Sequence, residues 1–208
     1  MVSLDSPWEI LAIVAAVGLL RVVYTVWKES PHRGFMLEIF DSLLIAFALV
    51  FFLIKPFVVA AFFIPSGSMR PTLHERDRLL VNKFIYRLTE PRRQDVIVFR
   101  APPEATPDDS QKDFIKRLIG LPGDVIQVRG YDGVYVNGVK LEESYIGPLY
   151  TADYDFGPSR VPEGRYFVMG DNRRDSNDSH RWGFLARENV LGKAMVIFWP
   201  PGRMALAR

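Results

Sequence analysis

Two long apolar runs near the start of the chain constrain its fold more than any other feature. The first extends from Trp8 to Trp27 and contains only two charged residues, Glu9 and Arg21. The second covers residues 37–55 and has no charge between Leu43 and Ile54. Because about 20 apolar residues in a helix cross the hydrocarbon core of a bilayer, we expect one or two transmembrane helices at about 8–27 and 37–55. An amphipathic helix is the alternative for the first run, and a buried helix of a soluble protein for the second.

The distribution of charge around these runs predicts their orientation. Residues 28–34, between the runs, carry a net positive charge, and loops of this kind tend to stay on the cytoplasmic side. A cleavable signal peptide is disfavoured, since the chain lacks a basic start and an A-x-A-like exit from the first run. We therefore expect residues 1–56 to anchor the chain in the cytoplasmic (inner) membrane and residues 57–208 to form an extracytoplasmic domain.

The sequence after residue 57 is typical of β structure. Short segments rich in β-branched and aromatic residues alternate with turns, and Asn137-Gly138 is a pair that a tight hairpin turn requires. No helical period separates them, so we expect a mainly β, antiparallel barrel or sandwich with a β-rich, variable insertion at about 130–162. Residues 101–109 and 144–162 are expected to be loops. The predicted strands cover residues 58–64, 78–85, 95–100, 114–119, 125–128, 134–141, 165–169 and 193–199.

Composition removes several classes of function. The net charge is +2 and no Lys/Arg block exceeds two residues, which argues against a nucleic-acid partner. The chain has no cysteine, so disulfides and thiol nucleophiles are excluded. His32, His74 and His180 lie far apart and outside any H-x-x-x-H pattern, and we expect no metal site.

A polar Ser66-Gly67-Ser68 turn follows an apolar segment and supplies candidate nucleophiles. A serine needs a positioned base, and lysines or carboxylates are the remaining candidates. Lys116 stands in an apolar strand, where burial favours the neutral amine that a base requires. Lys83 satisfies the same argument, whereas His74 lies in a polar turn typical of a solvated surface.

A third polar cluster covers residues 170–183 and directly follows a predicted strand. Its many Asp, Asn, Arg and Ser residues are compatible with a turn that satisfies its own hydrogen bonds. They are equally suited to hold a catalytic lysine and serine in position through supporting hydrogen bonds, without reacting themselves. Composition alone does not choose between these two roles.

Three ordered segments together resemble the motif boxes of type I signal peptidases, a family of Ser/Lys endopeptidases. The resemblance covers roughly residues 41–208 and is weakest across 131–160. The matching segments are Ile64–Met69 with Pro71–Leu73, Asp113–Asp124, and Gly170–Arg173 with Ser176, Asp178, Ser179, Trp182 and Gly183.

The resemblance implies a role for each matching residue. Ser68 is the expected nucleophile and Lys116 the general base, while Ser66 and the backbone N–H of Ser68 form the oxyanion hole. Ser176 is expected to orient the lysine amine, and Asp178 to hold the surrounding turn. No metal or cofactor is implied.

One position departs from the family pattern. The family often has arginine two residues after the aspartate, whereas this chain has His180 followed by Arg181. The departure puts the ion pair of Asp178 in doubt, and Arg181 or Arg173 are the expected substitutes.

The resemblance also implies the substrate and its partners. An extended preprotein signal peptide is expected to lie between residues 62–65 and 113–116 by addition of a β-strand, with small residues at −1 and −3 in shallow pockets. The lipid bilayer is the second expected partner, and no obligate protein partner is implied. The expected substrate-binding residues are Phe62, Ile64, Pro65, Met69, Leu73, Leu79, Val98, Asp113, Phe114 and Ile115.

Two kinds of alternative stay open at this stage. One is a Ser/Lys protease with a dedicated substrate, such as a pilin or conjugation factor, or one that cleaves itself like the SOS-response repressors. The absence of a DNA-binding segment disfavours self-cleavage of the repressor type. The other is a non-catalytic, membrane-tethered β-domain that binds extended peptides.

Overall fold

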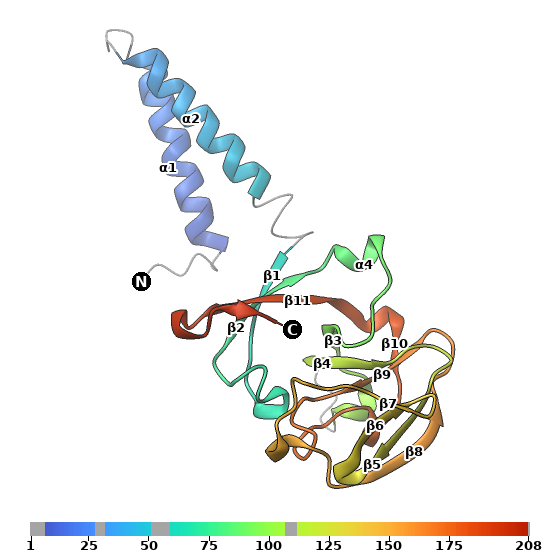
Figure 1. Cartoon of the computed structure of the whole chain (residues 1–208). Helices are drawn as coiled ribbons and strands as arrows, with labels where there is room; N and C mark the ends of the chain where they lie inside the picture. Colours follow the sequence, from blue (N-terminus) through green and yellow to red (C-terminus); the bar gives the residue numbers. More distant parts are fainter. Residues whose placement is uncertain (1–6, 28–31, 51–58, 107–111, 208) are drawn as a thin grey trace. The chain divides into compact units, whose positions relative to one another are not determined.

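The computed structural model describes residues 7–27, 32–50, 59–106 and 112–207. The chain divides into two compact units, residues 1–58 and 59–208. The first unit is helical and the second consists mainly of β-strands (Figure 1). Residues 51–55 of the second predicted span lie outside the described residues.

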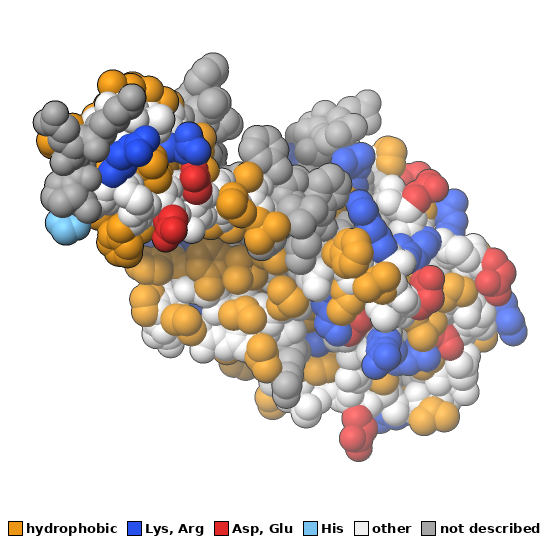
Figure 2. All heavy atoms as spheres, turned by 90° about the horizontal axis from the view of Figure 1, so that it is seen from above, with side chains coloured by type: hydrophobic (Ala, Val, Ile, Leu, Met, Phe, Trp, Pro, Cys, Tyr) orange, Lys and Arg blue, Asp and Glu red, His pale blue; other side chains and the backbone are white. Residues whose placement is uncertain are grey.

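The helical unit consists of α1 (Pro7–Val26) and α2 (Arg33–Ala48). The side chain of Arg21 on α1 forms an ion pair with Asp41 on α2. Hydrophobic side chains cover much of the helical surface visible in Figure 2. Within the described segments, neither helix combines the length and the apolar character required to cross a membrane. Exposed large hydrophobic residues here include Leu19, Val22, Val26, Phe35, Ile45 and Leu49.

The larger sheet of the β unit has eight strands, and the described pairings in it are all antiparallel. The strand order is β1-β2-β11-β3-β4-β9-β10, and β12 pairs with β11. The mainly antiparallel β fold expected from the sequence is therefore confirmed. The strands are β1 (Val59–Phe63), β2 (Arg78–Asn82), β3 (Val96–Arg100), β4 (Asp113–Gly120), β9 (Arg165–Met169), β10 (Leu185–Ala186), β11 (Val190–Trp199) and β12 (Ala205–Leu206).

A second sheet of four strands has the order β7-β6-β5-β8. Asn137 and Gly138 have φ of 55° and 80°, so the tight turn predicted between β6 and β7 is present. The prediction that residues 144–162 form a loop is wrong in part, because β8 lies within them and pairs with β5. The strands are β5 (Val125–Arg129), β6 (Gly133–Val136), β7 (Val139–Lys140) and β8 (Asp155–Arg160).

A short helix, α4 (Ile85–Leu88), replaces the end of one predicted strand. The side-chain oxygen of Asn82 accepts hydrogen bonds from the backbone N–H groups of Phe84 and Ile85, each at 2.9 Å. An asparagine that satisfies backbone donors in this way favours a helix start over continued strand pairing. The strand predicted for 78–85 therefore ends at Asn82.

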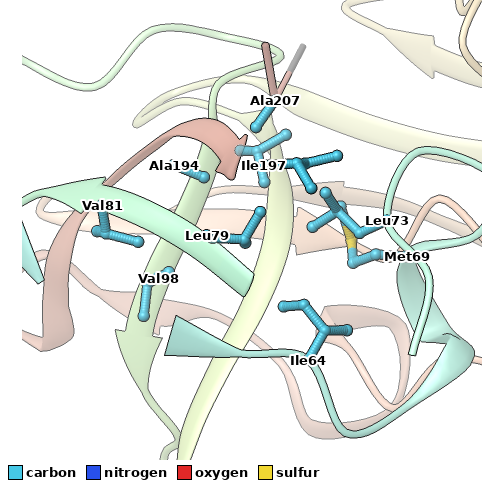
Figure 3. Packing of buried hydrophobic residues seen from close by; sticks show 10 residues of the cluster. Ile64, Met69, Leu73, Leu79, Val81, Val98, Ala194, Ile197 and Ala207 are labelled. Atoms are coloured by element: carbon cyan, nitrogen blue, oxygen red, sulfur yellow. The ribbon is translucent and has the colours of Figure 1, made fainter. Parts of the chain in front are cut away.

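A hydrophobic core includes Met69, the residue that follows Ser68 in the chain (Figure 3). Met69 and Leu73, which follow the serine, are fully buried and pack with side chains from β2, β3 and β11. Burying a side chain of this size stabilises the fold by roughly 1.5–3 kcal/mol. The residues beside Ser68 are consequently held by packing and not only by hydrogen bonds. The cluster comprises Ile64, Met69, Leu73, Leu79, Val81, Val96, Val98, Ala194, Ile197 and Ala207.

Candidate active site

Ser68 occupies a short 3₁₀ turn, Gly67–Met69, that follows β1. Ile64 fixes the entry to this turn, because its N–H donates to Asp77 O and its O accepts from Arg76 N–H, at 3.0 and 2.9 Å. Burial of Met69 fixes the exit. The half-buried Ser68 is therefore held between a hydrogen-bonded strand end and a core residue.

The polar cluster after β9 clamps the serine turn from the other side. The backbone N–H of Asn172 donates to Ser68 O at 3.1 Å, and its side-chain amide donates to Gly67 O at 3.3 Å. A Cβ atom on Gly170 would lie 2.4 Å from Ser68 O, closer than such atoms approach. Glycine is therefore required at position 170 for this close approach.

Lys116 reaches the serine from β4. Its Nζ lies 2.7 Å from Ser68 Oγ, and the residue is only 4% exposed. Burial destabilises the ammonium and lowers the pKa of Lys116 from 10.5 to about 8, although the charges of Asp178 and Asp171 oppose this shift. With this pKa, about a tenth of the amine is neutral at pH 7. Among the described residues, neither Lys83 nor His74 forms a hydrogen bond with Ser68.

Ser66 lies beside the nucleophile on the exposed side of the turn. Its Oγ is 3.4 Å from Ser68 Oγ. A hydroxyl in this place can turn its hydrogen toward an oxygen that receives charge during attack by Ser68. The geometry is therefore compatible with the oxyanion role that the resemblance implies.

The Ser68–Lys116 pair lies in an open cavity of about 530 Å³. Among the expected substrate-binding residues, Pro65, Asp113, Phe114 and Ile115 line this cavity. The others lie in or against the hydrophobic core: Phe62, Ile64, Met69, Leu73, Leu79 and Val98. Sequence reasoning did not single out Lys112, Asp175 and Asn177, which also line the cavity. No cluster of three His, Asp or Glu side chains able to hold a metal ion occurs in the described part of the chain.

Comparison with known proteins agrees with this geometry. The family model described as "Signal peptidase, peptidase S26" matches residues 36–199. The chain belongs to this family. The "Probable signal peptidase I-2" of a Synechocystis species is 45% identical over 179 residues, 86% of this chain and 80% of that protein. The "Signal peptidase I" of Leptolyngbya laminosa is 48% identical over 154 residues, which cover 73% of this chain and 74% of that protein.

A solved signal peptidase I from Enterococcus faecalis is 37% identical to this chain. The match covers 50% of this chain and 97% of that one, with a TM-score of 0.42. Membership of the signal peptidase family follows from the family model and from the two relatives.

A buried ion pair next to the Ser68–Lys116 pair was not predicted from the sequence. Arg117 donates to both carboxylate oxygens of Asp171, at 2.8 and 2.6 Å, and both side chains are almost fully buried. Thr72 donates to the same carboxylate at 2.5 Å. Arg117 follows Lys116 in β4, Asp171 lies in the cluster after β9, and Thr72 lies in the loop that carries Ser68. Their bonds therefore tie together the three segments that form the site. Two opposite charges in otherwise buried motif segments were the only signal in the sequence.

Asp178 holds the turn after β9, as expected, but its partner differs from the expected substitutes. Its carboxylate accepts from Gly170 N–H at 2.9 Å and lies 2.6 Å from Nδ1 of His180. Arg173 bonds instead to Glu143, and Arg181 Nε donates to His180. His180 therefore replaces the family's arginine directly, and the expectation of a substitute arginine was wrong.

Ser176 does not orient the lysine by a direct contact. Its Oγ is buried and forms no hydrogen bond with Lys116 in the described part of the chain. Burial alone raises the pKa of Asp178, but His180 and the Gly170 N–H together bring it below its usual value. The Ser176 hydroxyl has no hydrogen-bond partner among the described residues, and it is the charge of Asp178 that acts on Lys116.

Proposed function

We propose that this chain is a serine endopeptidase that removes signal peptides from exported preproteins, with Ser68 as nucleophile and Lys116 as general base. One observation carries the proposal: a buried lysine amine with a lowered pKa lies 2.7 Å from a serine hydroxyl in an open cavity. Membership of the signal peptidase family supports the same reaction.

The arrangement supports a two-step acyl-transfer mechanism. Ser68 Oγ attacks the scissile carbonyl carbon while the neutral Lys116 amine takes the hydroxyl proton. The negative charge on the former carbonyl oxygen is stabilised by the Ser66 hydroxyl and the backbone N–H of Ser68. The C–N bond then breaks, and the Lys116 ammonium gives its proton to the leaving amine. Water, activated by the same amine, attacks the acyl-enzyme and releases Ser68.

Two open strand edges support binding of an extended peptide. β1 is the first strand of the larger sheet and pairs only with β2 in the described part of the chain. β4 pairs with β3 along residues 113–117, whereas its described pairing with β9 begins at Arg117. Residues 113–116 therefore keep one edge open on the cavity side, where a peptide can add as a strand.

Alternation along such a peptide would direct its −1 and −3 side chains toward the sheet. We infer that the apolar residues of the core cluster and the partly buried Phe62 and Ile115 form shallow pockets for small side chains. Large −1 residues would require a well-packed core to move. Varying the −1 residue of a model preprotein from alanine to leucine should therefore abolish cleavage.

We also propose that the N-terminal unit anchors the enzyme in the cytoplasmic membrane with residues 59–208 outside. The support is the apolar surface of α1 and α2, where large hydrophobic side chains are exposed to solvent. Lipid is an environment in which such a surface costs no free energy of hydration. Protease protection of an N-terminal tag in sealed vesicles tests this orientation.

The catalytic proposal is tested by cleavage of a model preprotein by the full chain. Ser68→Ala and Lys116→Ala should each abolish cleavage while the circular dichroism spectrum and melting temperature show a folded domain. A serine-reactive acylating inhibitor should label the wild type and not Ser68→Ala. Retained cleavage by folded Ser68→Ala would overturn the mechanism.

A further inference from the structure

His180 sits at the junction of three groups behind the dyad. Its Nδ1 lies 2.6 Å from Asp178 Oδ1, and its Nε2 accepts a hydrogen bond from Arg181 Nε at 3.2 Å. The imidazole also stacks on the ring of Tyr154, with centroids 4.2 Å apart and planes inclined by 19°. Packing and two hydrogen bonds therefore fix the ring in one orientation.

The contacts of His180 select one tautomer of the neutral imidazole. Arginine is always protonated and can only donate, so Nε2 of His180 must act as an acceptor. The ring hydrogen consequently resides on Nδ1 and is donated to Asp178. A second proton on Nε2 would break the bond from Arg181 and face its positive charge, while it would strengthen the attraction to Asp178.

The charged and titratable groups around the ring can be enumerated from each neighbouring element. The turn after β9 contributes Asp178 and Arg173, whose charge acts on Tyr154, and α5 (Ser179–Trp182) contributes Arg181. The loop before β8 contributes Tyr154, next to Asp153, which pairs with Arg174 at 3.1 Å. Asp178 is thus the one carboxylate in direct contact with the imidazole among these groups.

Asp178 connects the imidazole to the catalytic base. Its negative charge favours the protonated form of Lys116, against the effect of burial. With a neutral imidazole as partner, the carboxylate exerts its full charge on the lysine. A protonated imidazole would neutralise the carboxylate and so weaken its hold on the lysine proton.

We propose that His180 is a positioning residue whose protonation, acting through Asp178, sets how firmly Lys116 holds its proton. The proposal rests on the function given above. An imidazole is the side chain that gains its charge between pH 5 and 8, unlike the permanently charged arginine of the family pattern. Wherever its imidazole is protonated, His180 therefore weakens the proton's hold on Lys116, and the enzyme keeps more of its activity.

Two variants at one position separate charge from structure. His180→Gln keeps a neutral donor for Asp178, whereas His180→Arg supplies a fixed positive charge, and both lose the imidazole stack on Tyr154. The first readout is the ¹³Cε chemical shift of Lys116 in lysine-labelled full chain, assigned by its absence in Lys116→Gln. The second is the rate of preprotein cleavage from pH 5.5 to 9.

We expect Lys116 to titrate at a pH lower by about half a unit in His180→Arg than in His180→Gln. Near pH 8, the cleavage rate of the wild type relative to its own rate at pH 9 should equal that of His180→Gln. Near pH 6 it should retain about threefold more of its pH 9 cleavage rate than His180→Gln retains, the factor that half a pH unit represents.

The outcomes distinguish this inference from the proposed function. If the wild type does not cleave preproteins, the proposed function fails, and the two lysine titrations still decide the inference. Should His180→Arg not fold, the inference is decided by the relative cleavage rates of the wild type and His180→Gln at pH 6. Coincident lysine titrations in the two variants, or equal relative rates of wild type and His180→Gln across the pH range, would overturn the inference.

Discussion

Strand β4 carries two buried basic residues side by side, Lys116 and Arg117, which differ in their partners and in their protonation. Lys116 is 4% exposed and Arg117 is 1% exposed, yet they project to opposite faces of the strand. Arg117 donates from Nε and Nη2 to the two carboxylate oxygens of Asp171, at 2.8 and 2.6 Å. Lys116 instead contacts the neutral hydroxyl of Ser68 and has a pKa lowered to about 8.

The comparison shows that the partner, and not burial alone, decides what a buried cation does. A buried charge that is paired remains charged and holds segments together. A buried amine without a contacting carboxylate is driven toward its neutral form and becomes a base. The same strand thus supplies a structural clamp on one face and a catalytic group on the other.

The largest expected effect comes from making position 116 a permanent cation. Lys116→Arg should lower kcat/KM for preprotein cleavage by about 10⁴-fold, because a guanidinium cannot accept the serine proton. Arg117→Lys is the matched control on the other face, because it retains a positive charge toward Asp171. Its folded fraction should keep most of the wild-type cleavage rate. Cleavage by Lys116→Arg at more than a tenth of the wild-type rate would contradict the assignment of the base.

Removing the partner of Arg117 should have the largest effect on stability. Asp171→Asn leaves the guanidinium buried without a counter-charge, and we expect a loss of about 3–5 kcal/mol in the free energy of unfolding. Urea denaturation measures this loss. The control is Asp132→Asn, which breaks the exposed pair with Lys140 and should change stability little. Equal effects of the two substitutions would show that the buried clamp is unimportant.

Loss of the oxyanion donor should affect turnover more than stability. Ser66→Ala removes a hydroxyl 3.4 Å from Ser68 Oγ and should reduce kcat by about 10²–10³-fold. Ser144→Ala, on an exposed serine that does not line the cavity, is the control. An unchanged kcat in Ser66→Ala would remove this residue from the mechanism.

Replacing the lysine by an apolar residue should stabilise the fold. The pKa of Lys116 is lower in the folded chain than the ordinary value of 10.5, so burial costs stability below about pH 8, and the cost disappears as the pH rises toward 10.5. Lys116→Met should therefore raise the free energy of unfolding at pH 7 by up to about 3 kcal/mol. Between pH 8 and 10.5 the wild type should gain on the variant. A destabilised Lys116→Met at pH 7 would contradict the cost assigned to the buried amine.

Much of the fold was predictable because alternation and turn residues act locally. The tight turn at Asn137-Gly138 and most strands followed from such patterns. β8 was missed because Gly157-Pro158 within it is typical of a turn. At Gly157 φ is +79°, and a Cβ would lie 2.4 Å from Ile126 O, so glycine there serves a close approach between two strands.

The candidate site was predictable as far as its motifs extend. Ser68 and Lys116, 48 residues apart, were joined only through the resemblance of three ordered segments, and the structure brings them to 2.7 Å. The pair of Arg117 with Asp171 was not predictable, because the strand pairing that joins residues 54 positions apart leaves no local pattern. The bond from His180 to Asp178 was missed because two neighbouring arginines offered a more obvious counter-charge.

The pH dependence of preprotein cleavage by the wild-type full chain tests the central claim most directly. If a buried Lys116 with a pKa of about 8 is the general base, kcat/KM should rise close to tenfold per pH unit below about pH 8 and level off above it. His180 is expected to soften only the most acidic part of this rise. A rate that is constant from pH 6 to 9, or that falls as the pH increases, would contradict the account.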